Sequence, residues 1–291
     1  MPELPEVEVT RRRIESQLVG RRIRAVRTTA DSHLFLTPPG VLRRALRGRT
    51  TTALRRHGKY LIATLDDGRR LVIHLGMTGQ LFSESASSVR LLAAATRQAL
   101  APEEQAAFRP DAHTHFWLAF DDDGPQVYYR DVRKFGKLLL LEPDERHPRL
   151  ERLGCDALEA RGELIFRASR KRRVPIKQLL LDQSLLAGVG NIYADEALFL
   201  SGVRPGRRAE RVTRRECDRL AETVGRVLRR SIETGGSSIR DYVAPDGRDG
   251  GYQFERHVYA RAGEPCFDCG SVVRKRVIAQ RGTHYCPTCQ K

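Results

Sequence analysis

The C-terminal stretch reads CFDC over residues 266–269 and CPTC over residues 286–289, with sixteen residues between the two cysteine pairs. Each pair can bend around one ion, and the spacer has the length of a two-stranded hairpin. Four thiolates without an open coordination position are typical of a structural, tetrahedral zinc site. Two disulfides are the alternative, which a cytoplasmic chain disfavours. We therefore predict one structural Zn²⁺ bound by Cys266, Cys269, Cys286 and Cys289.

The charge of the whole chain points to an anionic partner. Its 291 residues include 52 Lys and Arg against 36 Asp and Glu, a formal net charge of +16. Such an excess causes self-repulsion unless it faces an anion, so nucleic acid is the leading class of partner. Hydrophobic residues make up 40% and charged residues 30%, which is typical of a globular protein. We see neither a signal peptide nor a membrane-spanning run and expect a cytoplasmic protein.

A short link between two predicted helices is the next feature upstream. The sequence LAGVGN over residues 186–191 joins a helix expected over 176–186 to one expected over 191–200. Gly188 can end the first helix in a left-handed conformation, and Asn191 can cap the second. Free backbone N–H groups would then face outward, where a phosphate could bind. A purely structural corner is the alternative, and the basic run at 170–173 favours phosphate.

The first half of the chain has the period of a β domain preceded by a helix. Residues 3–18 predict an amphipathic helix with Val7, Ile14 and Leu18 along one side. Short β-like stretches follow, separated by turn signals, at 22–27, 60–65, 71–75, 116–120, 127–130 and 137–141. Residues 83–112 could hold a short helix or none. A further helix is expected over 213–234, opened by a capping box of Thr213 and Glu216.

The N-terminus offers a nucleophile. Removal of Met1 would leave Pro2 as a secondary amine, and an α-amino group titrates near pH ~8. Such an amine can attack a sugar C1′ and form an iminium. Glu3 and Glu6 lie three residues apart at a helix start, so they can divide acid and base work. The alternative is that this sequence is merely a good helix start.

Five motifs in a fixed order favour the chemical interpretation. They are PELPEVE at 2–8, HLGMTG at 74–79, DVRKFG at 131–136, GVGNIYADE at 188–196, and the cysteine hairpin with AQR at 279–281. In type, order and spacing, the chain resembles bacterial formamidopyrimidine-DNA glycosylase over essentially its whole length.

The resemblance implies a bifunctional DNA glycosylase and AP lyase of base excision repair. Such an enzyme excises oxidised purines, chiefly 8-oxoguanine and formamidopyrimidines, and cuts the abasic strand by β,δ-elimination. Its partner would be double-stranded DNA containing these lesions or abasic sites, and it would act as a monomer. The implied α+β fold has an N-terminal β-sandwich domain at 1–141, a linker at 142–152, a helix-two-turn-helix domain with a lesion-covering loop at 153–257, and a zinc finger at 258–291.

The resemblance also implies roles for individual residues. Pro2 would be the nucleophile, Glu3 the acid that helps to open the sugar, and Glu6 its support. Lys59 would serve β-elimination, and Arg281 would clamp phosphate and assist the δ step. The implied DNA contacts are Met77, His113, Arg133, Phe135, Arg173, Lys177 and Asn191. Of these, Met77, Arg133 and Phe135 match the residues that fill the hole left by an extruded base, which cannot be reached inside the stack.

Two other functions deserve comparison. An endonuclease VIII-like enzyme for oxidised pyrimidines typically carries glycine where this chain has Leu4, and it lacks the wedge of Arg133 and Phe135. A catalytically silent DNA-binding protein could use the same zinc hairpin, but it would not need Pro2, Glu3 and Lys59. All of these features favour the purine-specific enzyme.

Overall fold

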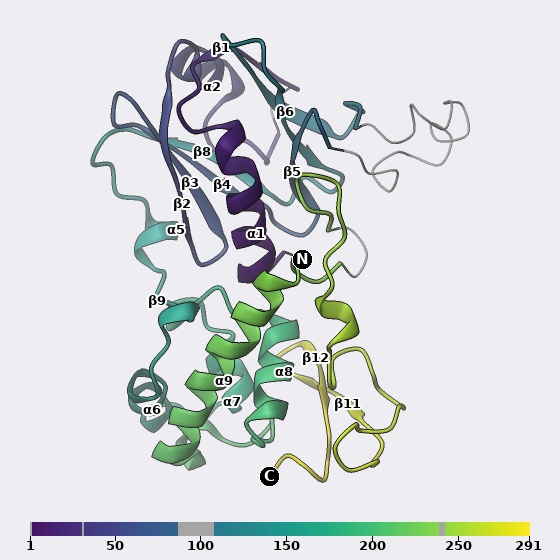
Figure 1. Ribbon diagram of the computed structural model, residues 1–291. Helices are drawn as coiled ribbons and strands as arrows, with labels where there is room; N and C mark the ends of the chain where they lie inside the picture. Colours follow the sequence, from purple (N-terminus) through teal and green to yellow (C-terminus); the bar gives the residue numbers. More distant parts are fainter. Residues whose placement is uncertain (1, 31, 87–107, 239–241) are drawn as a thin grey trace, which may run out of the picture. The chain divides into compact units, whose positions relative to one another are not determined.

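The computed structural model describes residues 2–30, 32–86, 108–238 and 242–291 (Figure 1). The chain divides into two compact units, residues 1–147 with 235–251 and residues 148–234 with 252–291. The first boundary falls inside the predicted linker. Residues 235–251 differ from expectation, because we assigned them to the second domain and they pack within the first unit.

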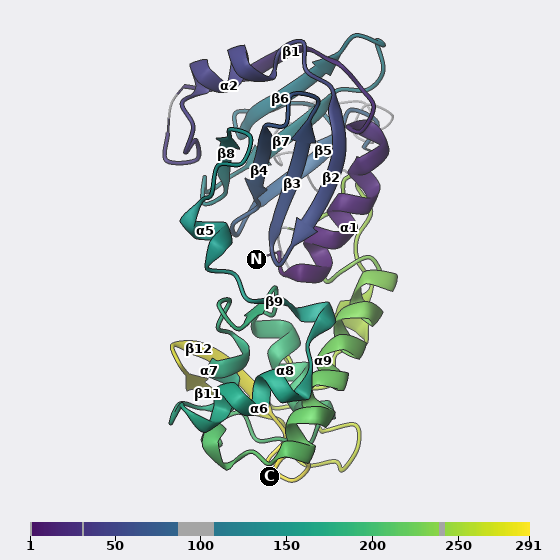
Figure 2. The same cartoon turned by 90° about the vertical axis from the view of Figure 1, so that its left-hand side faces the viewer.

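The first unit is built on an antiparallel β-sandwich, as predicted, and Figure 2 shows its two sheets as stacked layers. The strand orders are β1-β6-β7-β5 and β2-β3-β4-β8. The first sheet comprises β1 (Ile23–Thr28), β6 (Thr114–Phe120), β7 (Val127–Asp131) and β5 (Gly79–Ser83). The second comprises β2 (Thr51–His57), β3 (Tyr60–Leu65), β4 (Arg70–His74) and β8 (Lys137–Leu141).

The core of the sandwich follows the period-two pattern of its strands. In β3, Leu61, Ala63 and Leu65 are buried while the residues between them are half-buried. Helix α1 (Leu4–Ile14), extended by η1 (Glu15–Gln17), packs against β2, β3 and β5. Its predicted apolar side is confirmed, because Val7, Ile14 and Leu18 are all buried in this core. A second helix, α2 (Pro39–Leu46), packs against β1.

Residues 235–251 join the first unit through polar and apolar contacts with it. The backbone N–H of Ser237 donates to Glu6 Oε1 at 2.8 Å, and the Tyr242 hydroxyl donates to the Glu6 carbonyl at 3.1 Å. Arg13 pairs with Asp246, and Val243 is buried in an aromatic cluster with Phe82, Phe108 and Tyr128. These contacts explain why this segment belongs to the β-sandwich unit.

The second unit is helical. Its helices are α5 (Pro148–Glu151), α6 (Gly162–Arg170), α7 (Ile176–Leu180), α8 (Asn191–Leu200) and α9 (Arg214–Glu233), with single turns η3 (Ala157–Glu159), η4 (Ala209–Arg211) and η5 (Tyr252–Phe254). The predicted capping box is confirmed, because the Glu216 N–H donates to Thr213 Oγ1 and the Thr213 N–H donates to the Glu216 carboxylate. Within the described residues, none of the helices is long and apolar enough to cross a membrane.

The link between α7 and α8 is longer than we expected. Helix α7 ends at Leu180, and residues 181–190 form a turn that includes β10 (Leu186–Ala187), paired in parallel with β9 (Cys155–Asp156). Gly188 has a φ of +113° but does not end the first helix as predicted, because α7 already ends at Leu180. The predicted cap was wrong by one residue, because Gly190 is the N-cap and Asn191 is the first residue of α8.

Two adjacent buried carboxylates on α8 hold the C-terminal region. Asp195 pairs with Lys177 at 2.7 Å and accepts the backbone N–H of His284 at 2.8 Å. Glu196 accepts the backbone N–H groups of residues 257, 258 and 259. Because His284 lies in the hairpin of β11 (Arg274–Ile278) and β12 (Arg281–Tyr285), the two carboxylates fix both the hairpin and the chain leading to it.

We predict that Asp195→Asn strongly destabilises the second unit. The side chains of Asp195 and Lys177 are both fully buried, so the change leaves an uncompensated ammonium. Breaking a buried pair in this way costs about 3–5 kcal/mol of unfolding free energy. Thermal unfolding followed by circular dichroism measures the loss. The control is Glu233→Gln, which removes an exposed partner of Arg230 and should leave the midpoint unchanged; equal midpoints for the two variants would contradict the prediction.

Candidate active site

The N-terminal end of α1 holds the candidate catalytic carboxyl groups. Glu3 is the N-cap, and its N–H donates to Glu6 Oε2 at 2.8 Å, while the Glu3 side chain accepts from the Glu6 backbone. Both side chains are buried, with 3% and 1% of their surface exposed. Pro2, directly before the cap, is also buried. The two carboxyl groups are therefore held together by a capping box, as the spacing of the residues indicates, and Pro2 directly precedes it.

Glu6 also connects this helix end to residues 235–251. Its Oε1 accepts the Ser237 N–H, while its Oε2 accepts from Glu3. Gly236 has a φ of +87°, and a Cβ there would lie 3.2 Å from both Cγ and Oε1 of Glu6. Glycine at this position thus satisfies both the left-handed conformation and the close approach of the carboxylate.

Lys59 lies in the two-residue turn between β2 and β3. The ladder ends at the pair His57–Tyr60, so Gly58 and Lys59 form the tip of the hairpin. Gly58 has a φ of +54°, which a glycine adopts without strain. Lys59 is 8% exposed, although it is a lysine at a hairpin tip. The turn therefore holds this side chain against the protein and not in open solvent.

Met77, Arg133 and Phe135 lie on two neighbouring turns. A Cβ on Gly76 would lie 2.5 Å from the Phe135 backbone, and the Arg133 N–H donates to Thr78 Oγ1 at 3.1 Å. Met77 is 38% and Phe135 44% exposed. The Arg133 guanidinium stacks 4.4 Å from the centre of the Phe135 ring. The structure thus brings the three predicted wedge residues to one exposed apolar edge of the first unit.

The buried side chain of Asp131 joins these two turns by hydrogen bonds. Its fully buried carboxylate accepts from the Thr78 hydroxyl on one turn and from the N–H groups of Arg133 and Gly136 on the other. The Tyr129 hydroxyl also lies 3.4 Å from it, and burial raises the pKa of this phenol well above its ordinary value. A single carboxylate therefore fixes the positions of both turns.

His113 lies beside this region, in the loop before β6. Its N–H donates to Asp111 Oδ1 at 3.0 Å, and its carbonyl accepts the Asp131 N–H at 2.9 Å. Arg130 pairs with Asp111 at 2.8 Å. Although burial opposes ionisation, these interactions hold the pKa of Asp111 below its ordinary value. The preceding predicted stretch, 83–112, lies largely outside the described residues.

The candidate DNA contacts of the second unit divide into exposed and buried groups. Arg173 is 85% exposed by its side chain, and Arg281, the first residue of β12, is exposed. Asn191 donates its amide to the Gly282 carbonyl at 2.9 Å. Lys177 differs from our expectation of a DNA contact, because it is fully buried and its ammonium binds Asp195, Thr283 Oγ1 and the Gly282 carbonyl. In this position it holds the hairpin and offers no surface to a phosphate.

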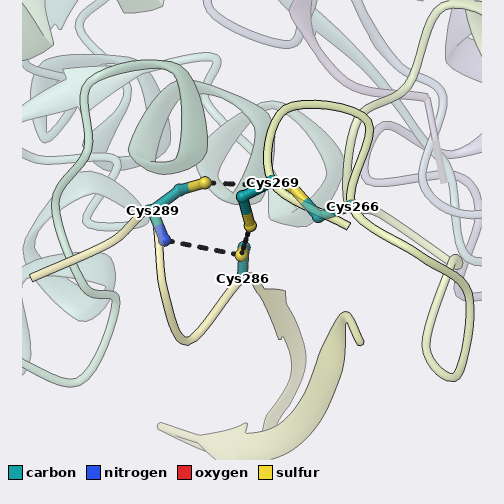
Figure 3. A group of neighbouring side chains, drawn as sticks. All are labelled: Cys266, Cys269, Cys286 and Cys289. Atoms are coloured by element: carbon teal, nitrogen blue, oxygen red, sulfur yellow. Dashed lines mark hydrogen bonds between the residues drawn. The ribbon is translucent and has the colours of Figure 1, made fainter. Parts of the chain in front are cut away.

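The four cysteines predicted to bind zinc lie together, with their side chains pointing toward one another (Figure 3). All four Sγ atoms lie within 4.8 Å of one another, and two sulfur pairs are separated by 3.9 and 3.5 Å. A tetrahedral ion with Zn–S bonds of about 2.3 Å requires sulfurs about 3.8 Å apart. The cluster therefore fits one structural Zn²⁺. Cys155 and Cys217 do not belong to this cluster. Burial raises the pKa of the Cys217 thiol to about 11.

Several positioning residues were not predicted from the sequence. Asp131, Asp195 and Glu196 occur inside motifs that we quoted, but we gave them no role. The residue type could have indicated such a role. An acidic residue inside an otherwise apolar stretch must find hydrogen-bond partners when it is buried. In α8, for example, Asp195 and Glu196 lie between Ala194 and Ala197, and all four are buried.

Family models match nearly the whole chain. The N-terminal domain of formamidopyrimidine-DNA glycosylase matches residues 1–138, and the H2TH domain of the same enzyme matches residues 153–243. A zinc finger found in Fpg and IleRS matches residues 263–291.

Relatives and solved structures agree with these matches. Formamidopyrimidine-DNA glycosylases of Thioalkalivibrio sulfidiphilus and Neisseria meningitidis are each 41% identical to this chain, with complete coverage of both sequences. The crystal structure of MutM (Fpg) from Thermus thermophilus matches with a TM-score of 0.83 and 38% identity, covering 99% of this chain and 98% of that one. An Fpg mutant of Lactococcus lactis in complex with Fapy-dG-containing DNA matches with a TM-score of 0.85 and 35% identity over both full chains. This chain therefore belongs to the formamidopyrimidine-DNA glycosylase family.

Proposed function

We propose that this protein is a bifunctional DNA glycosylase and AP lyase that excises oxidised purines and cleaves the resulting abasic strand. The observation that carries the proposal is the buried N-terminal group of Pro2, Glu3 and Glu6, held by the capping box of α1. The Lactococcus lactis relatives bound to Fapy-dG DNA and to abasic-site DNA support these two substrates. 8-Oxoguanine is the further substrate that we propose.

The chemistry begins at Pro2, whose amine is free once Met1 is removed. Its lone pair attacks C1′ of the lesion nucleotide, the glycosidic bond breaks, and the base leaves with the proton that the Pro2 nitrogen gives up. Glu3 supplies a proton to the sugar ring oxygen, so the ring opens and C1′ becomes an iminium on the Pro2 nitrogen. Glu6 does not react in this scheme, since both of its oxygens already bind backbone N–H groups.

Strand cleavage follows from the iminium. The C2′ proton is acidified by the iminium and is removed as the 3′ phosphate leaves, which is the β-elimination that we assign to Lys59. A second elimination releases the 5′ phosphate and is assisted by Arg281. Hydrolysis of the remaining iminium returns the free Pro2 amine.

The wedge residues support the extrusion step. A base that leaves the stack leaves a hole that costs a few kcal/mol unless it is filled. Met77 and Phe135 offer exposed apolar surface for this hole, and the Arg133 fork can bond the edge of the opposite base. His113, Arg173 and Asn191 contribute contacts to the DNA backbone. Lys177 acts indirectly, because its buried ammonium holds the hairpin that carries Arg281.

The zinc ion supplies structure and no chemistry. Four cysteines leave no open coordination position for water or substrate. Bound Zn²⁺ fixes the hairpin, whose exposed cations Arg274, Lys275, Arg276 and Arg281 can face phosphate.

We propose that the enzyme acts in the cytoplasm at the nucleoid. An incision assay that compares 8-oxoguanine with oxidised-pyrimidine duplexes tests the substrate class, since a preference for pyrimidines would favour the endonuclease VIII-like alternative.

Loss of zinc should weaken DNA binding without unfolding the β-sandwich. Cys269→Ser removes one of four ligands, and metal binding is coupled to folding of such small sites. Fluorescence anisotropy with a lesion duplex measures the loss, and circular dichroism of the sandwich strands is the control. Full lesion cleavage after verified removal of zinc would contradict the structural role.

Arg133→Ala should reduce discrimination by the base opposite the lesion, beyond lowering general affinity. The side chain is the only polar group of the wedge, so its loss removes a base-edge contact worth about 1–3 kcal/mol. Single-turnover rates opposite cytosine and adenine measure the effect, with Met77→Ala as the matched apolar control. Unchanged relative rates in Arg133→Ala would rule out this role.

Borohydride should trap one enzyme per DNA strand as a reduced amine on Pro2. Retention of Met1 should abolish the adduct, because the Pro2 nitrogen is then an amide without an available lone pair. Glu3→Gln should bind damaged DNA but lose base excision, while cleavage of a ready-made abasic site partly survives. Mass spectrometry of the digested adduct identifies the residue, and an adduct mapped to Lys59 would overturn the assignment.

A further inference from the structure

Arg56 connects the nucleophile helix to the turn that carries Lys59. We infer that Arg56 is a positioning residue that sets Lys59 for β-elimination, an inference that rests on the role proposed for Lys59. Its Nε donates to Glu8 Oε2 of α1 at 3.0 Å, and its Nη1 donates to the Gly58 carbonyl at 3.0 Å. One guanidinium therefore binds both the helix that follows Pro2 and the peptide that precedes Lys59.

The turn needs such a constraint. The strand ladder ends at His57–Tyr60, so the peptide between Gly58 and Lys59 lies beyond the last cross-strand pair. Because a peptide is planar, fixing the Gly58 carbonyl fixes the Lys59 N–H and the direction of its Cα. The side chain of Arg56 is largely buried, with 7% of its surface exposed. Its bond to Gly58 restrains the peptide that precedes Lys59.

Arg56 is one of three arginines whose charges favour the ionised form of Glu8. The Glu8 carboxylate also accepts from Arg11 at 3.1 Å and from Arg12 at 2.8 Å. Burial opposes ionisation of Glu8, but these arginines hold its pKa below the ordinary value. Loss of Arg56 therefore leaves Glu8 paired, and the principal change is in the geometry of the turn.

Arg12 provides a matched control. Its side chain binds the same carboxylate as Arg56, but it is 58% exposed and its Nε donates a hydrogen bond to Glu8. Arg12→Met and Arg56→Met thus remove one cation each from Glu8, and only the second removes the bond to Gly58. A difference in cleavage rate between the two variants therefore measures the effect of the bond between Arg56 and Gly58.

The experiment separates imine formation from strand cleavage on a duplex with one abasic site. Arg56→Met should slow β-elimination roughly 10- to 100-fold, as expected for a misplaced catalytic group. Borohydride trapping should persist or increase, because the iminium forms but is consumed slowly. Arg12→Met should match the unmodified protein in both assays. Arg56→Lys is the second test variant, used if Arg56→Met folds poorly. It keeps a cation beside Glu8 but lacks the guanidinium that binds Glu8 and Gly58 together, so it should also slow β-elimination.

A Lys59→Met background decides whether Arg56 acts through Lys59. The double variant should cleave no more slowly than Lys59→Met alone. Additive losses, parallel loss of trapping and cleavage, or equal behaviour of Arg56→Met and Arg12→Met would each overturn the inference. If Lys59→Met itself cleaves at the normal rate, the proposed role of Lys59 in β-elimination is wrong. That result is distinct from one showing that Arg56 does not position Lys59.

Discussion

The Glu6 carboxylate is the interaction on which the candidate active site depends. One oxygen accepts the N–H of Glu3 and the other the N–H of Ser237, so a single buried group joins the start of α1 to residues 235–251. A buried carboxylate is tolerated only when its oxygens are satisfied, and here backbone donors satisfy both. The position of Glu3 is therefore set by backbone geometry before any substrate binds.

Buried carboxylates hold other irregular segments of the described chain in the same way. Asp131 binds the two turns of the wedge, Asp195 binds the hairpin that contains Arg281, and Glu196 binds three successive N–H groups at 257–259. Turns and loops cannot satisfy their own backbone groups as helices and strands do. A carboxylate with two acceptor oxygens can fix several N–H groups at once, which makes it suited to holding such segments.

The longest helix and several strands could be predicted from the sequence, whereas the short helices α2 and α6, of eight and nine residues, and the irregular segments were not. Helix α9 and its capping box, the strands with apolar alternation, and the cysteine cluster were all confirmed. Strands β2 and β5 were missed, since Leu54 is the only large apolar residue of β2 and Gln80 and Ser83 of β5 are buried polar residues. Lys177 was assigned to the DNA because it matches a DNA contact of the family that the chain resembles, and its burial depends on partners from distant positions that no local pattern reveals.

Burial of these carboxylates also keeps their negative charge away from the protein surface. Glu3, Glu6, Asp131, Asp195 and Glu196 are each at most 3% exposed, so their charge is neutralised or shielded inside the fold. Arg173 and Arg281, in contrast, are exposed. Phosphates that approach the protein therefore meet guanidinium groups, while the carboxylates that position them contribute little repulsion at the surface. The buried acidic residues inside the motifs and the exposed arginines are thus two parts of one electrostatic arrangement.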